Sequence, residues 1–389
     1  FKQKTAYEIM PSLVGSEMCI RDSCTRRAEK VERIMENGVE IVINHIEPYK
    51  LKNEPSSFTL EKEFEIDLER EDIAKIGLTE IYDFDVDSKG NIYILDFHNP
   101  EKLIFKFDAE GNYLKSFCRI GQGPGELPKS FKMWIGVIKD DEIYVFSKNK
   151  FLFIKTDGTL IKEVKTPFNP LDAKCLSNGN YILEKLEWEG KAYSTFIYSL
   201  YDSQFNKINE LDRIKVPTGF AQRVKGIYHN IIAEVNAGKI FTGSQGRDYE
   251  IYVYDFDGNL IRKIRKEYKK VSPSIEYKDK FLSMFKGSPR VYEAAKKRIY
   301  FPSHLPPFHY FLSDNKGRLY VMTYEKGDNE GEYMFDIFNP EGVFIGRKSL
   351  KDFSATDHLK GKIKNDYFYC IEEKESGFQK LVVYKMLWH

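Results

Sequence analysis

The chain has 389 residues, with 60 basic and 59 acidic side chains and a formal net charge of +1. Such a balanced charge argues against a general electrostatic attraction to nucleic acid or to an anionic membrane, so no nucleic-acid partner is expected. Hydrophobic residues make up 42% of the chain and aromatic residues 15%, which supports a large core and argues against extensive disorder.

Residues 1–23 read better as translated DNA than as protein. Lys2 to Glu8 and Leu13 to Ser23 match one reading frame of a transposase-type sequencing adapter, and the four residues between them fit a barcode. We therefore interpret residues 1–23 as an adapter-derived artefact and exclude them from the fold prediction, because such scars carry no information about the fold.

Cys24 is the first residue after this segment, and the charged run TRRAEKVERIMENG follows it. The lipid-modified cysteine of a bacterial lipoprotein stands in such a context, at the start of a polar tether. Cys24 is therefore a candidate lipid-attachment site that would anchor the chain to a membrane. The alternative is an ordinary cysteine in a longer chain. We interpret residues 24–56 as a tether and a lead-in strand.

Residues 81–117 alternate apolar and polar side chains in the manner of short β-strands, with tight turns at DSKG (87–90) and DAEG (108–111). Four such strands form a meander. The same order recurs in five later segments: 132–167, 170–211, 230–264, 309–350 and 358–386. The last segment holds only three strands, and the alternating segment 58–68 can supply the fourth.

Six units predict an all-β, six-bladed β-propeller over residues 57–389, because a ring closed by an N-terminal strand leaves no unpaired edges between its first and last blades. Two short helices within 269–300 are expected as an insert between blades 4 and 5. The basic segment LIRKIRKEYKK (260–270) is predicted to be an exposed outermost strand, where alternating charge protects a sheet edge.

The first unit resembles the NHL repeat. Its residues Val86 to Asp96 match the pattern V-D-x-x-G-N-I-Y-V-x-D apart from Ile94, and Asn99 and the run from Phe107 to Gly111 complete the match. From residue 38 to the end the chain is similar to six-bladed propeller lipoproteins of gut-type Gram-negative bacteria. The resemblance implies the fold and a periplasm-facing or surface position in the cell envelope. It implies no function, because propellers carry many activities.

Candidate ligand-binding residues lie in the loops that a propeller gathers on one face of its ring. A Trp or Tyr face with a nearby Arg suits sugars, peptides or anionic ligands, and histidines could add polar contacts. The alternative for each of them is an ordinary solvated rim. The candidates are His98, Trp188, Arg223, Tyr228, Arg247, His304 and His309.

No metal site or cofactor is expected, because no pair of histidines has helical i, i+4 spacing and no carboxylate–histidine motif surrounds them. The Gly-rich run GQGPGE (121–126) lacks the Lys-Ser/Thr of a P-loop and is expected to be a compact turn.

The sequence contains no nucleophile elbow or other catalytic constellation, so no catalytic residue is assigned and an enzyme is not the favoured interpretation. We expect a monomeric binding module of the bacterial envelope, whose partner is a small molecule, a glycan, a peptide or another envelope protein. One alternative is a lactonase-like, metal-dependent hydrolase or lyase with His, Asp, Glu or Asn ligands at the channel mouth. Another is a scaffold that docks envelope proteins through residues 269–300.

Overall fold

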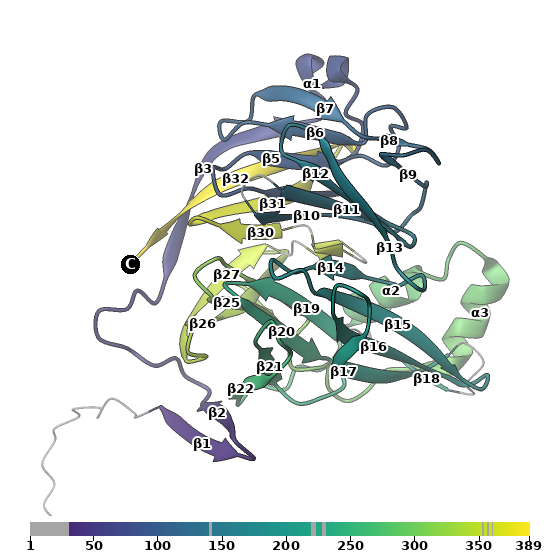
Figure 1. Ribbon diagram of the computed structural model, residues 1–389. Coiled ribbons are helices and arrows are strands. Elements are labelled where there is room, and N and C mark those ends of the chain that lie inside the picture. Colours follow the sequence, from purple (N-terminus) through teal and green to yellow (C-terminus); the bar gives the residue numbers. More distant parts are fainter. Residues whose placement is uncertain are drawn as a thin grey trace, which may run out of the picture. The chain divides into compact units, whose positions relative to one another are not determined.

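The computed structural model describes residues 31–139, 142–218, 223–227, 231–351, 354–355, 358–359 and 361–389. The predicted adapter-derived segment 1–23 and the candidate lipid site Cys24 lie outside these ranges. In the described part, six antiparallel four-stranded units follow one another around a common centre (Figure 1). The predicted fold class, an all-β six-bladed propeller, is confirmed.

The first three blades use strands that are consecutive in the chain. Blade 1 consists of β4 (Asp83–Val86), β5 (Ile92–Leu95), β6 (Ile104–Phe107) and β7 (Tyr113–Phe117). Blade 2 consists of β10 (Met133–Lys139), β11 (Glu142–Ser147), β12 (Lys150–Lys155) and β13 (Leu160–Lys165). Blade 3 consists of β14 (Ala173–Cys175), β15 (Tyr181–Glu189), β16 (Tyr193–Tyr201) and β17 (Lys207–Pro217).

The other three blades follow the same order of strands. Blade 4 consists of β19 (Ile231–Asn236), β20 (Lys239–Ser244), β21 (Glu250–Tyr254) and β22 (Leu260–Lys266). Blade 5 consists of β24 (Tyr310–Ser313), β25 (Leu319–Lys326), β26 (Glu332–Phe338) and β27 (Phe344–Lys351). Blade 6 consists of β30 (Gly361–Lys364), β31 (Tyr367–Glu373), β32 (Gln379–Trp388) and β3 (Phe58–Asp67).

The tight turns inside the blades are built by their own residues. The Asp87 Oδ1 accepts hydrogen bonds from the backbone N–H groups of Lys89 and Asn91, both at 2.9 Å, and Oδ2 accepts one from the Tyr93 hydroxyl at 3.0 Å. Gly90 lies at φ 86°, a conformation that costs glycine little. The motif D-x-x-G-N therefore dictates a hairpin from local interactions alone.

Each blade packs its faces against the two neighbouring blades. Between blades 6 and 1, for example, Phe84 and Ile94 share one buried cluster with Leu381. In the same sheet, β3 pairs antiparallel with β32, with Phe58 opposite Trp388 and Asp67 opposite Lys380. The segment predicted to complete the last blade, 58–68, thus occupies the fourth position of that sheet.

The predicted insert between blades 4 and 5 forms α2 (Ile275–Ser283) and α3 (Pro289–Arg298). The Ser274 side chain caps α2 by accepting the Tyr277 N–H at 3.1 Å, and Pro289 opens α3. A short parallel pair, β18 (Val224–Lys225) and β23 (Ile299–Tyr300), joins the insert to the link between blades 3 and 4.

Other short elements occupy the links between blades. The helix α1 (Glu71–Ile76) was not predicted. Two acidic residues in its first turn and Gly77 at φ 87° mark its ends. The remaining short strands are β8 (Arg119–Ile120), β9 (Glu126–Leu127), β28 (Ser354–Ala355) and β29 (His358–Leu359). None of the helices in the described ranges combines the length and apolar character needed to cross a bilayer.

An N-terminal hairpin extends blade 4 beyond its four strands. β1 (Glu32–Glu36) and β2 (Val39–Asn44) pair antiparallel, and β2 pairs parallel with β22 (Figure 1). The prediction of an exposed outermost strand at 260–270 is therefore wrong, because β2 covers this edge. The basic side chains form ion pairs instead: Arg262 Nε lies 2.6 Å from a Glu40 oxygen. Part of the predicted tether is also a strand.

Residues 45–57, which we call the strap, lead from this hairpin past blade 5 to blade 6. The Tyr49 N–H donates to the Phe344 carbonyl at 2.8 Å, and the Ser56 N–H donates to the His389 carbonyl at 3.0 Å. At Gly346 a Cβ atom would lie 1.9 Å from the Ser56 carbonyl oxygen, so the strap requires glycine there. The strap thus links three blades through backbone contacts.

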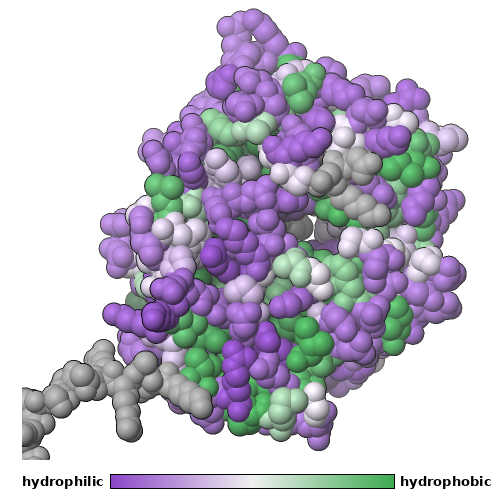
Figure 2. All heavy atoms as spheres, turned by 60° about the vertical axis from the view of Figure 1, so that its left-hand side comes forward, coloured by the Kyte–Doolittle hydropathy of each residue, from purple (hydrophilic) through white to green (hydrophobic). Residues whose placement is uncertain are grey.

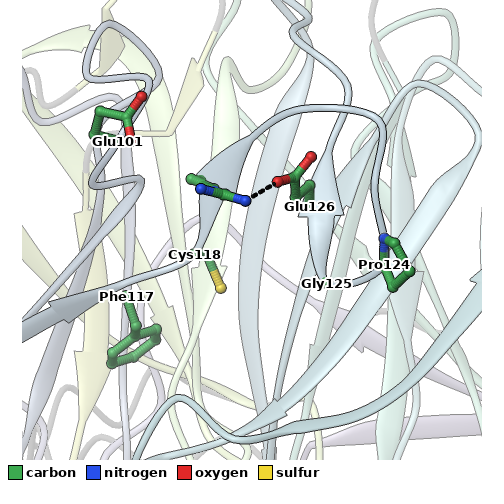
Figure 3. A pocket seen from close by; sticks show the side chains of 7 residues that line it. Glu101, Phe117, Cys118, Pro124, Gly125 and Glu126 are labelled. Atoms are coloured by element: carbon green, nitrogen blue, oxygen red, sulfur yellow. Dashed lines mark ion pairs between the residues drawn. The ribbon is translucent and has the colours of Figure 1, made fainter.

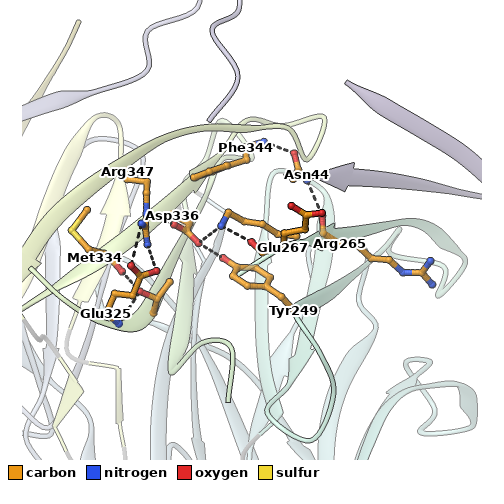
Figure 4. Close-up of polar contacts among 11 residues, drawn as sticks. Asn44, Tyr249, Arg265, Glu267, Glu325, Met334, Asp336, Phe344 and Arg347 are labelled. Carbon is orange, nitrogen blue, oxygen red and sulfur yellow. Dashed lines mark hydrogen bonds and ion pairs between the residues drawn. The ribbon is translucent and has the colours of Figure 1, made fainter. Parts of the chain in front are cut away.

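Next to the start of the strap, a buried charged network joins blades 4 and 5 (Figure 4). Asp336, with none of its side chain exposed, accepts hydrogen bonds from Tyr249 at 3.0 Å and Arg347 at 2.8 Å and lies 3.3 Å from Lys266 Nζ. Burial lowers the pKa of Lys266, although Asp336 opposes that shift. Asn44 at the end of β2 donates to the Gly342 carbonyl at 3.0 Å, so the hairpin is fixed to the same junction.

Candidate functional site

The strands β4, β10, β14, β19, β24 and β30 are the innermost strands of their blades, and they surround the propeller axis (Figure 1). Neighbouring innermost strands contact one another, for example β4 with β10 and β24 with β30. Figure 2 shows a small opening near the middle of one face of the molecule. Polar side chains on the innermost strands are therefore the ones that a ligand at the axis would meet.

Four of the blades place a charged side chain at the axis. They are Asp85 on β4, Lys174 on β14, Glu234 on β19 and Lys362 on β30, and we call this set the axial charge ring. The charges of Lys174, Lys362 and Asp85 all act on the pKa of Glu234, although they come from three other blades. Their side chains must accordingly face one shared space.

The two lysines are paired only loosely. Lys362 Nζ lies 3.3 Å from Asp85 Oδ1, and Lys174 Nζ lies 3.4 Å from Asp172 Oδ2. Both distances exceed the roughly 2.7–2.9 Å of a short charge-assisted hydrogen bond. The exposed fractions of the Lys362 and Lys174 side chains are 32% and 26%, so both side chains are only partly buried inside the ring of blades.

Burial and charge shift the pKa values in this space. Burial lowers the pKa of Lys174 and of Lys362, but nearby carboxylates, Asp172 and Asp85 first among them, outweigh it and leave both values raised. For Glu234, burial outweighs the two lysines and raises the pKa to about 7. The lysines are therefore charged at neutral pH, and Glu234 can change its charge near neutrality.

Blade 2 contributes an aromatic group where four of the other blades contribute charges. Gly136 on β10 pairs with Tyr144 on β11, and a Cβ at Gly136 would lie 2.3–2.6 Å from the end of the Tyr144 ring. The missing side chain thus makes room for the ring on the innermost strand. Burial, followed by the nearby Cys175, Asp172 and Asp85, raises the pKa of Tyr144, so its hydroxyl stays protonated.

A second carboxyl group lies beside Asp172. Asp172 accepts hydrogen bonds from Trp134 Nε1, from the Tyr198 hydroxyl at 3.0 Å and from its neighbour's N–H at 2.8 Å. Glu184 has no such set, and burial followed by the Asp172 charge raises its pKa to about 8. Sequence patterns gave no indication of this pair.

The carboxylates of β4 also connect blades 1 and 2. Asp83 accepts the Ile135 N–H at 3.0 Å, and Asp85 accepts the Val137 N–H at 2.8 Å. Burial raises the pKa of Asp83 despite the opposing charge of Lys362. Asp85 consequently has one oxygen engaged with β10 and the other facing Lys362.

Arg247, a predicted ligand-binding residue, is engaged by the protein itself. Its two terminal nitrogens donate to the Asp212 carboxylate at 2.6 and 2.7 Å, and its guanidinium lies 4.1 Å from the centre of the Tyr252 ring. Asp212 is buried on blade 3, so this bidentate pair joins blades 3 and 4. A ligand would have to compete for these donors.

Three other candidates lie near the helical insert, in the links between blades 3 and 4 and between blades 4 and 5. Arg223 packs over the Tyr300 ring at 4.8 Å, and His304 is exposed beside Ser303. The His309 ring contacts Tyr324, and Gln245 donates to the His309 carbonyl at 2.6 Å. Tyr228 lies outside the described residues.

The remaining two candidates lie apart from that group. Trp188 is 66% exposed near the end of β15. His98 follows blade 1's second strand, with its ring 2.7 Å from Glu80 and 4.1 Å from the Phe97 ring centre. The structure therefore does not gather the six described candidates into one site, and the binding role of all seven stays a prediction.

Glu80, Asp96 and His98 are, within the described ranges, the one set of three side chains close enough to hold a metal ion. Asp96 already accepts hydrogen bonds from four donors of the chain, namely Thr79 N and Oγ1, Glu80 N and His98 N. This group lies on blade 1 and not among the residues of the axial charge ring.

The Gly-rich link between blades 1 and 2 borders a shallow depression of about 220 Å³ (Figure 3). Carboxylates of the protein already accept hydrogen bonds from the backbone of this link. The Gly123 N–H donates to Glu126 at 2.8 Å, and the Gly125 N–H donates to Glu163. Glu126 also pairs with Arg119 at 2.6 Å. A phosphate would find these groups already engaged, in keeping with a compact turn.

Sequence reasoning missed the axial charge ring. The available signal was a charged residue inside the apolar first strand of a unit, as in FDV around Asp85, AKC around Lys174 and AEV around Glu234. Such a residue faces either solvent or the axis, and only the position of the strand in the sheet distinguishes the two.

Solved structures with similar folds were found among bacterial proteins. A protein of Bacteroides fragilis thought to be exported is 14% identical, with a TM-score of 0.53, covering 88% of this chain and 99% of its own. A Bacteroides vulgatus member of the duf4221 family is 12% identical, with a TM-score of 0.49 and coverages of 86% and 100%. A Xanthomonas campestris gluconolactonase is 8% identical, with a TM-score of 0.38 and coverages of 77% and 88%. At these identities the likeness concerns the fold alone.

Among curated proteins, none matches this sequence. A family model does match, over residues 37–341, which is well over half of the chain. Its description, 6-bladed beta-propeller, agrees with the six sheets of the structure. The chain belongs to the DUF5128 family of 6-bladed beta-propellers.

Proposed function

We propose that this propeller is a ligand-binding module of the bacterial cell envelope and that its ligand binds in the axial channel at the axial charge ring. The observation that carries the proposal concerns the bonding of the Glu234 side chain. Within the described part of the chain, its carboxyl group has no hydrogen bond or ion pair, although Lys174 and Lys362 are near enough to influence its pKa. Partly buried charged groups with unused bonding capacity are typical of binding sites.

The proposal is tested by a thermal-shift screen of purified protein against amino acids, short peptides, monosaccharides and organic acids. Three channel variants are compared with wild type: Lys174→Met, Lys362→Met and Glu234→Gln. Lys207→Met, which removes an exposed lysine of β17, is the matched control. A ligand of the channel raises the melting temperature of wild type and control but not of the channel variants. A ligand effect equal in all proteins would contradict the channel as the site.

The alternative function, metal-dependent hydrolysis or lyase chemistry, predicts a different result. Purified protein would retain a stoichiometric metal ion, measured by mass spectrometry, and would turn over lactones. Either finding, abolished by Glu80→Gln or His98→Gln but unaffected by Lys174→Met, would move the function to blade 1.

The envelope location and the lipid anchor rest on Cys24 and the polar run after it. The exported Bacteroides protein shares the fold only. The intact gene, expressed in a Gram-negative host with labelled palmitate, tests the anchor: incorporation that disappears in Cys24→Ala supports it, and an unlabelled chain contradicts it. NHL-type repeats and a monomeric state are further parts of the proposal, and light scattering of the purified protein tests the latter.

A further inference from the structure

We propose that the axial charge ring recognises a zwitterionic ligand of the amino-acid or short-peptide class, with the ligand carboxylate at Lys174 and Lys362 and its ammonium at Asp85 and Glu234. This inference rests on the proposed function and adds the chemical class of the ligand.

Charges of both signs are distributed around the axis. Blades 1 and 4 contribute carboxyl groups, whereas blades 3 and 6 contribute ammonium groups, and the blades between them contribute none to this ring. A ligand with a single sign of charge meets charges of both signs here, because carboxyl and ammonium groups act on one another across the axis. A ligand with one charge of each sign can pair with both kinds at once.

The charged groups of the ring can form more hydrogen bonds than they form within the protein. An ammonium group has three donors, and in the described structure Lys362 forms one ion pair, with Asp85 at 3.3 Å. Lys174 likewise forms one, with Asp172 at 3.4 Å. Glu234 forms neither a hydrogen bond nor an ion pair with described residues. Both ends of a zwitterion would thus gain charge-assisted hydrogen bonds without breaking strong internal ones.

The charged groups of the ring are partly buried. Burial is the largest single influence on the pKa values of Lys174, Lys362 and Glu234, which means that water screens the charges less here than at the outer surface. Charge pairs in such surroundings contribute more to binding than exposed pairs do. The channel therefore discriminates by charge pattern more strongly than the rim loops can.

Glu234 also couples binding to pH. Its carboxyl group faces Lys174 from blade 3, Lys362 from blade 6, and Asp172 and Asp85 from blades 3 and 1. Because its pKa is about 7, the group is mostly neutral in mild acid and mostly charged in mild base. The ligand ammonium should therefore bind more tightly as the pH rises through about 7, with release of a proton.

Calorimetry with four forms of one dipeptide tests the inference on wild-type protein alone. The probes are free L-alanyl-L-alanine, its N-acetyl form, its C-terminal amide, and the doubly capped form. We expect the free dipeptide to bind and each single cap to weaken binding by about 10- to 100-fold, the loss typical for a hydrogen bond to a charged group. Equal binding of free and singly capped forms would overturn the zwitterion proposal.

Variants assign each end of the ligand. In Lys174→Met and Lys362→Met the difference between the free and amidated dipeptide should shrink. In Glu234→Gln the difference between the free and acetylated dipeptide should shrink, and the rise in affinity across pH 7 should flatten. Lys207→Met should behave as wild type. An unchanged preference in all three channel variants would contradict these assignments.

The outcomes separate this inference from the proposed function. If no dipeptide binds but another ligand's thermal shift depends on Lys174, Lys362 or Glu234, the channel remains the binding site and the zwitterion assignment is wrong. If no ligand depends on these residues, both proposals fail. Melting temperatures of the variants without ligand identify any that fail to fold, and the capped-peptide series on wild type is independent of them.

Discussion

Blade 1 and blade 4 each have four consecutive strands but differ in what lies at their outer edge. Blade 1 takes all of its strands from residues 83–117, and its turns are fixed by Asp87 and Asp108 within a few residues. Blade 4 takes its central strands from 231–266 but adds a hairpin from 32–44, almost two hundred residues earlier. Blade 1 is built from one stretch of the chain alone, whereas the sheet of blade 4 is extended by a distant part of the chain.

The outermost strands of blades 1 and 4 are protected in different ways. The edge strand β7 of blade 1 keeps exposed side chains, including Lys115. The corresponding strand of blade 4, β22, is covered by β2, and its arginines pair with Glu36 and Glu40. Protection by exposed charge and protection by an added strand thus occur in one molecule. If this comparison holds, long-range contacts at blade 4 should affect stability more than local contacts in blade 1.

The largest effect is expected from Asp336→Ala at the junction of blades 4 and 5. The change leaves Lys266, which is 3% exposed, and one donor of Arg347 without a carboxylate. Loss of one partner of a buried pair costs about 3–5 kcal/mol of the free energy of unfolding. Urea unfolding measures it, with Glu187→Ala at the exposed Lys185 pair as the control that should change stability far less. Similar losses in both variants would contradict a strong junction.

Asn44→Ala should have the next largest effect, because Asn44 joins β2 to both neighbouring blades. Its side chain donates to the Gly342 and Arg265 carbonyls and accepts the Phe344 N–H at 2.8 Å. Leaving these buried groups unsatisfied should cost about 2–3 kcal/mol. Hydrogen exchange of the Phe344 amide should accelerate, whereas the exposed Asn178→Ala should leave it unchanged. A protected amide in Asn44→Ala would argue against a hairpin held at this point.

Two turns of blade 1 share the D-x-x-G-N motif but differ in burial. Asp87 is buried and accepts a fourth hydrogen bond from the Tyr93 hydroxyl, whereas Asp108 is more exposed and accepts three. We expect Asp87→Ala to cost about 2 kcal/mol and Asp108→Ala about 1 kcal/mol or less. Thermal unfolding of the two single variants measures the difference. Equal costs would mean that the turn motif alone sets the stability.

The smallest effect is expected from Glu40→Gln on β2. Burial raises the pKa of Glu40, but hydrogen bonds from Arg33 and Arg262 outweigh it and leave the pKa below its ordinary value. The charged form thus stabilises the fold above that ordinary value, and the contribution disappears as the pH falls through the lowered pKa. The variant should lose about 0.5–1 kcal/mol at neutral pH and little in acid. A loss independent of pH and of salt would exclude the ion pair as its cause, with the exposed Glu61→Gln as the control.

Much of the propeller was predictable because its information is local. The alternation of strands and the Asp and Gly residues of the turns are both read within windows of about ten residues. Each of the six units was therefore recognisable from its own residues. Counting the strands of the last unit showed that one was missing, and segment 58–68 matched it. The helices α2 and α3 were predicted for the same reason.

The site was predicted poorly because its information is not local. Arg247 looked like a free rim residue, yet Asp212 on the neighbouring blade binds its guanidinium. Lys174 and Glu234 looked like ordinary strand positions, yet their strands lie innermost. Neither fact can be read from spacing along the chain, because both depend on which blades become neighbours.

The pattern of residues alone predicted the six units and their turns, because hairpins form from contacts between residues close in the chain, and the strand count of the last unit pointed to 58–68 as its missing strand. The packing of the blades set the remaining features: the hairpin 32–44 covers β22, and four charges from separate blades lie around one axis. Such pairings depend on the free energy of packing whole sheets against one another, and a single strand carries no record of its distant neighbours.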